Sequence, residues 1–208
     1  MTGQGAPPPA GLEGVVRGLE TQVRMPFTDY QYGTLMRQGA QVGPRQRACL
    51  YYRTGAGKTL TGLALLRVWG QETAVVIAPP STHAAWEAWG DNIGVQLHCM
   101  SHAKFRQPKT KLARNVPVIV DEFHLLGGHR GKGWMKMDRM ASGLQAPLII
   151  MSATPNYNDA ERVYCIHHVL APEEVRGGFL SFLYKYCDTE QDPFSQTPIV
   201  LNFKDFDG

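Results

Sequence analysis

The amino-acid sequence predicts an α/β fold built on a mostly parallel, doubly wound sheet with helices on both faces. Short runs rich in β-branched and aromatic residues, typical of strands, alternate along the chain with stretches of helical periodicity. The runs are almost continuously apolar, as expected of parallel strands covered on both faces. The expected strands are residues 48–52, 73–78, 95–99, 118–121 and 147–152.

Length and composition limit the class of protein. The chain has 208 residues, 43% of them hydrophobic, which is enough for one sizeable core and excludes a disordered chain. The net charge of +3 is too small for a general polycation, so any affinity for nucleic acid must come from a local patch. Residues 101–140 are such a region, with nine Lys and Arg against three acids.

Cysteine usage and apolar run length bear on the compartment. The four cysteines form no CxxC pair, which argues against a zinc cluster and a disulfide scaffold and favours a reducing setting. The longest apolar runs have the size of strands, and none approaches the ~20 residues of a membrane span. We therefore expect a cytoplasmic protein that does not enter a membrane.

The chain divides into three expected segments. Residues 1–24 begin with a Gly/Pro-rich stretch and are expected to be a flexible leader. Residues 25–186 contain all five expected strands. Residues 187–208 hold five acids and a single Lys, and are expected to be an acidic tail or the start of a connection to something absent.

A glycine-rich segment, RTGAGKT at residues 53–59, lies between the first expected strand and a helix. In that context backbone N–H groups and the helix N-terminus can wrap a polyphosphate. Lys58 adds a charge for the β- and γ-phosphates, and the Thr59 hydroxyl is a hard ligand suited to Mg²⁺. Tyr52 stands where the strict GxxxxGK[ST] pattern has its first glycine. The predicted nucleotide-binding residues here are Thr54, Gly55, Ala56, Gly57, Lys58 and Thr59.

Two neighbouring acids follow the fourth expected strand. A phosphate loop needs a carboxylate to hold Mg²⁺ and a general base to orient the attacking water. Asp121 reaches the C-terminal edge of the sheet and suits the metal, and Glu122 suits the base. His124 is a further catalytic candidate because it lies beside these acids, although a histidine in such a place is more often an ordinary loop residue.

A hydroxyl-bearing segment follows the fifth expected strand at the same edge. Ser152, Ala153 and Thr154 are candidates for coupling, because hydroxyls there can sense the γ-phosphate site through hydrogen bonds to the acidic pair. The plain alternative is a turn before Pro155.

These segments together resemble a known superfamily. The phosphate loop, DEFH at residues 121–124 and SAT at residues 152–154 are similar, in order, to motifs I, II and III of superfamily 2 helicases and translocases. VVIAPP at residues 75–80 followed by Trp86 is similar to motif Ia of the chromatin-remodeller type and related phage and restriction-enzyme translocases. TPNYN at residues 154–158 resembles the extension after their third motif. Phe123 departs from the alanine usual in DEAH, and SAT is the helicase form where many remodellers have a glycine.

The resemblance implies one RecA-like P-loop NTPase lobe that uses ATP and Mg²⁺, with Lys58, Asp121, Glu122 and His124 as catalytic residues. Thr59 and Asp121 would hold the metal. FTDYQ at residues 27–31 resembles the element whose glutamine reads adenine, and the Gln31 amide has the donor and acceptor for it. An exposed glutamine at the start of a helix is the alternative for that residue.

The resemblance also implies partners. Family members use two lobes, and the arginine finger of the second lobe has no counterpart here, so the second lobe would come from another chain or from missing sequence. DNA or RNA would be bound without sequence preference. If the chain is phage-encoded, its compartment is the host cytoplasm. The expected nucleic-acid contacts are Pro80, Ser81, Thr82, Ser101, His102 and Lys104, with the basic stretch 104–114 as an addition.

Two functions are compatible with the sequence. The first is the N-terminal motor lobe of a helicase or translocase, with weak ATP hydrolysis by the isolated chain. The second is a nucleotide-dependent nucleic-acid-binding or regulatory module with little ATP turnover. The complete set of loop and acidic residues favours the first, and the missing arginine finger favours the second.

Overall fold

The computed structural model describes residues 11–43, 45–153, 159–175, 177–192 and 198–204. These residues form two compact units. The larger unit contains residues 11–123 and 143–153 of the described chain, and the smaller unit contains residues 124–142 and 159–204.

The larger unit is built on a five-stranded parallel sheet in the order β1-β5-β4-β2-β3. Every predicted strand is present, with each boundary within one residue of the prediction. The sheet confirms the predicted α/β class. The strands are β1 (Arg47–Tyr51), β2 (Thr73–Ile77), β3 (Gln96–Met100), β4 (Val118–Val120) and β5 (Leu148–Ser152).

Two interior strands of the sheet, β4 and β5, are buried on both faces. All residues of β4 and β5 are buried, and because successive side chains of a strand point to opposite faces, both faces of the sheet are covered there. The parallel register pairs Ile119 with Ile149 and Tyr51 with Ser152. The carboxyl ends of β1, β5 and β4 therefore lie along one edge.

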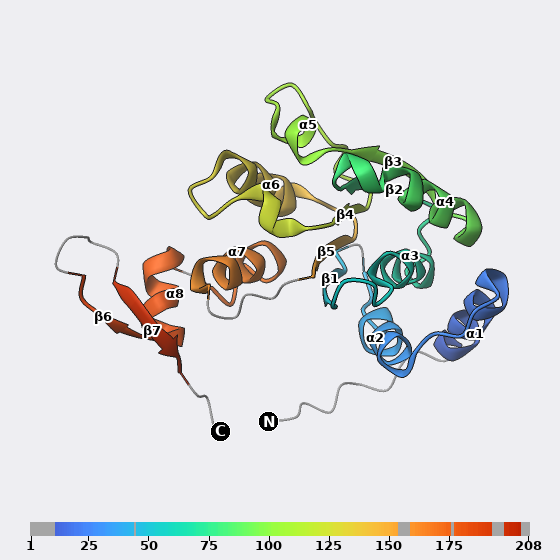
Figure 1. Cartoon of the computed structure of the whole chain (residues 1–208), viewed down its shortest axis with the longest axis horizontal. Coiled ribbons are helices and arrows are strands. Elements are labelled where there is room, and N and C mark those ends of the chain that lie inside the picture. The colour runs from blue at the N-terminus through green and yellow to red at the C-terminus, as the bar shows by residue number, and fades with distance from the viewer. Residues whose placement is uncertain (1–10, 44, 154–158, 176, 193–197, 205–208) are drawn as a thin grey trace. The chain divides into compact units, whose positions relative to one another are not determined.

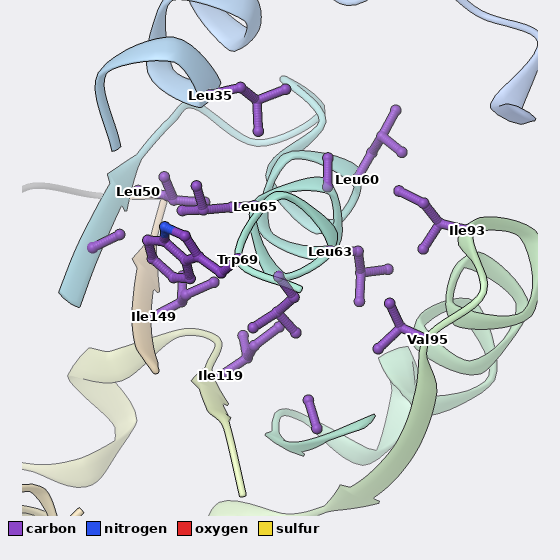
Figure 2. Close-up of a cluster of buried hydrophobic side chains, with 14 of the residues drawn as sticks. Leu35, Leu50, Leu60, Leu63, Leu65, Trp69, Ile93, Val95, Ile119 and Ile149 are labelled. Atoms are coloured by element: carbon purple, nitrogen blue, oxygen red, sulfur yellow. The ribbon is translucent and has the colours of Figure 1, made fainter. Parts of the chain in front are cut away.

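Helices of the larger unit pack around α3 (Lys58–Val68), which contacts α1 (Leu12–Val23), α2 (Asp29–Gly39) and α4 (His83–Ile93) (Figure 1). Figure 2 shows Leu65 of α3 beside Leu50 of β1, and Leu63 turned toward Ile93 and Val95. Every residue from 60 to 66 is buried, so this helix is a core element. A short 3-10 turn, η1 (Pro80–Thr82), precedes α4, and a five-residue helix, α5 (His102–Arg106), follows β3.

The expectation of a flexible leader over residues 1–24 is wrong for residues 12–23, which form α1. Leu12, Val16, Leu19 and Val23 lie on one face of this helix at helical spacing and are buried in the main core. That apolar stripe was present in the sequence, but the glycines at 14 and 18 and the Gly/Pro-rich start obscured it. Residues 1–10 lie outside the described part of the chain.

The smaller unit contains helices and a β-hairpin. Its helices are α6 (Lys132–Gly143, whose last residue belongs to the larger unit), α7 (Ala160–Leu170) and α8 (Gly178–Tyr186). Rings of Trp134, Tyr164 and Phe182 lie near one another in its core. The turn η2 (Phe123–Leu126) spans the boundary between the units.

The expected acidic tail is also corrected by the structure. β6 (Cys187–Glu190) and β7 (Ile199–Phe203) pair antiparallel, with an irregularity between Asp188 and Thr189. Cys187 is buried, which fixes one end of the hairpin. The largely apolar run at 199–203 is compatible with a strand, but the acids and prolines around it favoured a loop. No helix in the described ranges has the length and apolar character needed to cross a membrane.

The packing of α1 yields a stability prediction. We expect Leu19→Ala to lower the free energy of unfolding by about 2–5 kcal/mol, because it leaves a cavity in the core. Val15→Ala on the exposed face of the same helix is the control, and its effect is expected to stay within about 0.5 kcal/mol. Urea unfolding measures both. Equal small effects would mean that α1 does not belong to the core.

Candidate nucleotide-binding site

The phosphate loop connects the end of β1 to the first turn of α3. Gly55 and Gly57 have φ values of +79° and +78°, in the left-handed region that favours glycine. The Ala56 N–H donates to the Arg53 carbonyl oxygen over 3.1 Å and closes the turn. The first N–H groups of an α-helix have no partner within the helix, so the start of α3 offers donors at the end of the loop.

A cavity of about 530 Å³ lies over this loop, within the larger unit. Its volume is in the range of small-molecule and cofactor sites, about 300–1,000 Å³. Three of the segments singled out in the sequence contribute to its lining. The predicted residues that line the cavity are Gln31, Gly55, Ala56, Gly57, Lys58, Thr59, Asp121 and Glu122.

Tyr52 explains how the loop tolerates a residue other than glycine at its start. Its hydroxyl donates to Thr34 Oγ1 over 2.6 Å, and its ring packs edge-to-face on Tyr30 with centroids 4.9 Å apart. The side chain is thus directed to α2, and only the backbone contributes to the loop. The Tyr52 carbonyl oxygen accepts a hydrogen bond from Lys58 Nζ at 3.1 Å, so the Lys58 ammonium lies across the loop.

Gln31 lies against the phosphate loop from α2. Its Oε1 accepts hydrogen bonds from Thr28 N and Thr28 Oγ1, each at 2.9 Å. The bond from Thr28 N is one half of a capping box at the start of α2, and in the other half the Thr28 side chain accepts from the Gln31 N–H. Its Nε2 lies 3.5 Å from the carbonyl oxygens of Ala56 and Gly57. A Cβ atom at Gly57 would collide with this amide nitrogen. The buried position of Gln31 excludes the alternative of an exposed glutamine.

Asp121 is a buried carboxylate at the end of β4, with an exposed fraction of 9%. Its Oδ1 accepts from the Glu122 N–H at 3.0 Å, and its Oδ2 accepts from Trp86 Nε1 at 3.4 Å. Burial and then the neighbouring Glu122 carboxylate raise the pKa of Asp121, while those hydrogen bonds and the Lys58 ammonium act in the opposite direction. A divalent cation at this place would offset the cost of the buried charge.

Glu122 combines a functional position with an unusual backbone. Its φ of +48° lies in the left-handed region, which is unfavourable for a residue with a Cβ by about 1–2 kcal/mol. It is half-buried and lines the cavity beside Asp121. Such backbone strain in a residue next to a buried acid is typical of functional sites.

The remaining predicted site residues are less closely associated with the cavity. Thr54 is exposed in the turn and is not among the lining residues. Ser152 is buried at the end of β5, and Ala153 follows it half-buried. Thr154 lies outside the described residues. His124 belongs to the smaller unit, and its predicted role stays a prediction.

The predicted nucleic-acid contacts lie in two short segments. In the first, Pro80 and Ser81 of η1 are exposed, while the Thr82 hydroxyl donates to the Pro79 carbonyl oxygen at 2.9 Å. In the second, Ser101 caps α5 by accepting from Lys104 N at 3.1 Å, and the Lys104 side chain is exposed. The basic stretch continues with exposed Arg106, Lys109, Lys111 and Arg114.

His102 differs from the expectation of a nucleic-acid contact. Its side chain is buried, with an exposed fraction of 5%, and its Nε2 lies 2.9 Å from the Asp121 carbonyl oxygen. A carbonyl oxygen only accepts, so Nε2 carries the proton in this bond. The side chain therefore supports the end of β4 from inside the protein. The prediction that His102 contacts nucleic acid at the surface is wrong for this side chain.

Sequence reasoning missed several residues of the site. Met25, Pro26 and Trp89 line the cavity, and the Tyr30 hydroxyl donates to the Ala56 carbonyl oxygen. Trp89 lies three residues after Trp86 on α4, a spacing that places both on neighbouring parts of one helix face. The contact of Trp86 with Asp121 had no signal in either segment alone, because it joins residues 35 positions apart.

The acidic residues suit a metal ion that is held partly by phosphate oxygens better than one held by protein side chains alone. Among the described residues, no group of three or more His, Cys, Asp or Glu side chains is placed to hold a metal ion. Mg²⁺ in nucleotide sites takes one or two carboxylates and completes its shell with phosphates and water. Thr59 and Asp121, which line one cavity, are compatible with that mode.

Comparison with known proteins identifies the fold. The chain is similar to the SWI2/SNF2 ATPase core of Sulfolobus solfataricus in complex with dsDNA, at 18% identity and a TM-score of 0.63, over 79% of this chain and 40% of that one. The SWI2/SNF2 ATPase core domain of the same organism matches at 18% identity and a TM-score of 0.61, over 77% and 38%. No protein-family model and no curated protein matches the sequence.

The chain therefore has the predicted RecA-like α/β fold, which it shares with these ATPase core structures. It spans about two-fifths of the length of the solved structures that it matches.

The strained backbone of Glu122 predicts an inverted ranking of two variants. A protein with glycine at a given position is normally less stable than one with alanine there. In the left-handed region the order reverses, because glycine has no Cβ atom and avoids the steric penalty. We expect Glu122→Gly to be more stable than Glu122→Ala by about 1 kcal/mol. Both variants remove the same carboxylate, so charge does not enter the comparison. Chemical unfolding measures the difference, and a more stable alanine variant would contradict a left-handed Glu122.

Proposed function

We propose that this chain is the ATP-binding lobe of a DNA translocase or helicase and that it hydrolyses ATP when a second RecA-like lobe completes the site. The observation that carries the proposal is the meeting of the phosphate loop, Gln31 and the Asp121-Glu122 pair around one cavity. These are chemically the parts that a nucleoside triphosphate needs: donors for phosphates, an amide for the base and carboxylates for metal and water.

Each residue has a distinct part in the proposed reaction. Lys58 and the first amides of α3 bind the β- and γ-phosphates and orient them. Thr59 and Asp121 would hold Mg²⁺, which supplies charge neutralisation at the phosphates when bound. Glu122 orients the attacking water and accepts its proton. Gln31 recognises adenine after its amide turns from the Thr28 contacts to the base.

Nucleotide binding is the direct test of the phosphate loop. We expect Lys58→Ala to weaken MgADP binding at least about tenfold, because a charged hydrogen-bond partner contributes roughly 1.5–3 kcal/mol. Glu122→Gln should retain binding and lose hydrolysis, since its amide cannot accept a proton. Calorimetry gives the affinities, with Lys185→Ala on the exposed face of α8 as the control. Unchanged affinity in Lys58→Ala would contradict the nucleotide site.

DNA binding is supported by the exposed basic stretch and by the likeness to an ATPase core solved with dsDNA. Phosphate contacts release counterions, so the binding should be independent of sequence and steeply dependent on salt. We expect reversal of Lys109, Lys111 and Arg114 to Glu to reduce the salt slope by up to about three.

Fluorescence anisotropy over a salt series measures this slope. The control reverses three exposed arginines outside the stretch, Arg24, Arg37 and Arg45, at the same change in net charge. An equal loss of slope in both triple variants would show that only total charge matters, and that the stretch is not the binding surface.

The second lobe is proposed because hydrolysis spreads charge over the γ-phosphoryl oxygens. An arginine facing that charge contributes about 10³–10⁵ in rate. We expect slow ATP turnover by the isolated chain and a large gain when a second RecA-like lobe is added in trans. Steady-state ATPase at several protein concentrations, with and without DNA, is the measurement. Fast turnover independent of concentration would overturn the half-motor proposal, and none under any condition would favour the regulatory module.

A further inference from the structure

Two buried polar side chains from separate segments meet at Asp121. Trp86 of α4 donates its indole N–H to Asp121 Oδ2 at 3.4 Å, and His102 of α5 donates from Nε2 to the Asp121 carbonyl oxygen at 2.9 Å. Their exposed fractions are 1% and 5%. Buried N–H groups without a partner are costly, so both side chains depend on Asp121 as much as Asp121 depends on them.

Trp86 binds the side chain of Asp121, and His102 binds its backbone. The Glu122 N–H binds Oδ1 and the Trp86 indole binds Oδ2, so the orientation of the carboxylate is set by one local and one distant donor. The Asp121 N–H donates to the Ile77 carbonyl oxygen at 2.9 Å, and His102 binds the carbonyl oxygen of Asp121 itself. A small displacement of α4 or α5 would therefore change the position of the metal-binding carboxylate.

Trp86 is joined to the first candidate nucleic-acid segment by a compact turn. The His83 ring lies 3.1 Å from the Ala78 carbonyl oxygen, and Thr82 bonds back to Pro79, so residues 78–83 close on themselves. The exposed Ser81 lies in this turn, which continues directly into α4. A nucleic-acid phosphate bound at Ser81 would therefore displace the turn and α4 together.

His102 is joined to the second segment in the same way. Ser101 caps α5, and the Thr110 hydroxyl donates to the Lys104 carbonyl oxygen at 2.7 Å, so the helix and the following turn form one small body. His102 and the fully buried Phe105 face the protein, while Lys104 and Arg106 are exposed. Lys104 and Arg106 belong to the same five-residue helix as His102, so a displacement of this helix would move His102 as well.

From this geometry we propose that Trp86 and His102 are positioning residues that link nucleic-acid binding at η1 and α5 to the placement of Asp121. The inference rests on the proposed function, because it assumes that both ligands bind. Linkage is reciprocal: DNA changes the affinity for MgADP by the same factor by which MgADP changes the affinity for DNA. Sequence-independent DNA contacts are sufficient, since only displacement of the two segments is needed.

The test measures MgADP affinity by calorimetry with and without a mixed-sequence DNA duplex. Wild-type chain should show a DNA-induced change of about fivefold or more. Trp86→Phe and His102→Leu should lose that change while retaining metal-free ADP binding and DNA binding in the absence of nucleotide. His102→Gln should restore it, because its amide offers a donor of similar reach to the Asp121 carbonyl oxygen.

A matched control separates positioning from loss of stability. Trp69 is buried elsewhere in the core and donates its indole N–H to the Gln38 carbonyl oxygen at 3.1 Å. Trp69→Phe removes an equivalent bond and should retain the full DNA-induced change, even where its thermal unfolding temperature falls as far as that of Trp86→Phe. If Trp86→Phe does not fold, the pair His102→Leu and His102→Gln decides the question.

The outcomes distinguish this inference from the proposed function. Unchanged MgADP binding in Lys58→Ala removes the nucleotide site and the inference with it. If Lys58→Ala loses binding but Trp86→Phe and His102→Leu retain the wild-type DNA-induced change, only the inference is overturned. Absence of any DNA-induced change in wild-type chain that binds both ligands overturns it as well.

Discussion

The burial of β4 and β5 on both faces is the constraint on which the rest of the larger unit depends. Strands of this kind pair in parallel and return by crossovers, so all of their carboxyl ends collect at one edge. Because β5 lies between β1 and β4, the phosphate loop and the acidic pair are separated by two strand spacings, roughly 10 Å. In the proposed function, the polyphosphate and its cation would lie along this edge, between the phosphate loop and the acidic pair.

The same edge concentrates features that do not favour the folded state by themselves. Asp121 is a buried acid beside a second acid, and Glu122 adopts a left-handed backbone. The surrounding core, with α3 buried along most of its length, tolerates these features. Functional sites commonly contain such locally unfavourable features, and the well-packed sheet and helices around them supply the stability that offsets the cost.

Much of this organisation was predictable because it depends on local patterns. The strands, α3 and the phosphate loop follow from apolar periodicity, glycine placement and the order of the segments. α1 was missed because its stripe of four apolar residues is interrupted by glycines, and the β6–β7 hairpin because polar residues surround it. The burial of His102 and the bond from Trp86 to Asp121 arise from tertiary packing, which no single segment encodes.

Gly57 has a meaning beyond the conformation of the phosphate loop. Glycine is needed there for the backbone angle, and it also makes room for the Gln31 amide, which occupies the space that any side chain would fill. Gln31 is expected to select the base, and the loop is expected to hold the phosphates. The two are therefore in steric contact at a single position, Gly57. Any side chain at residue 57 would disturb both the loop backbone and the Gln31 amide, so under the proposed function one substitution there affects base recognition and phosphate binding together.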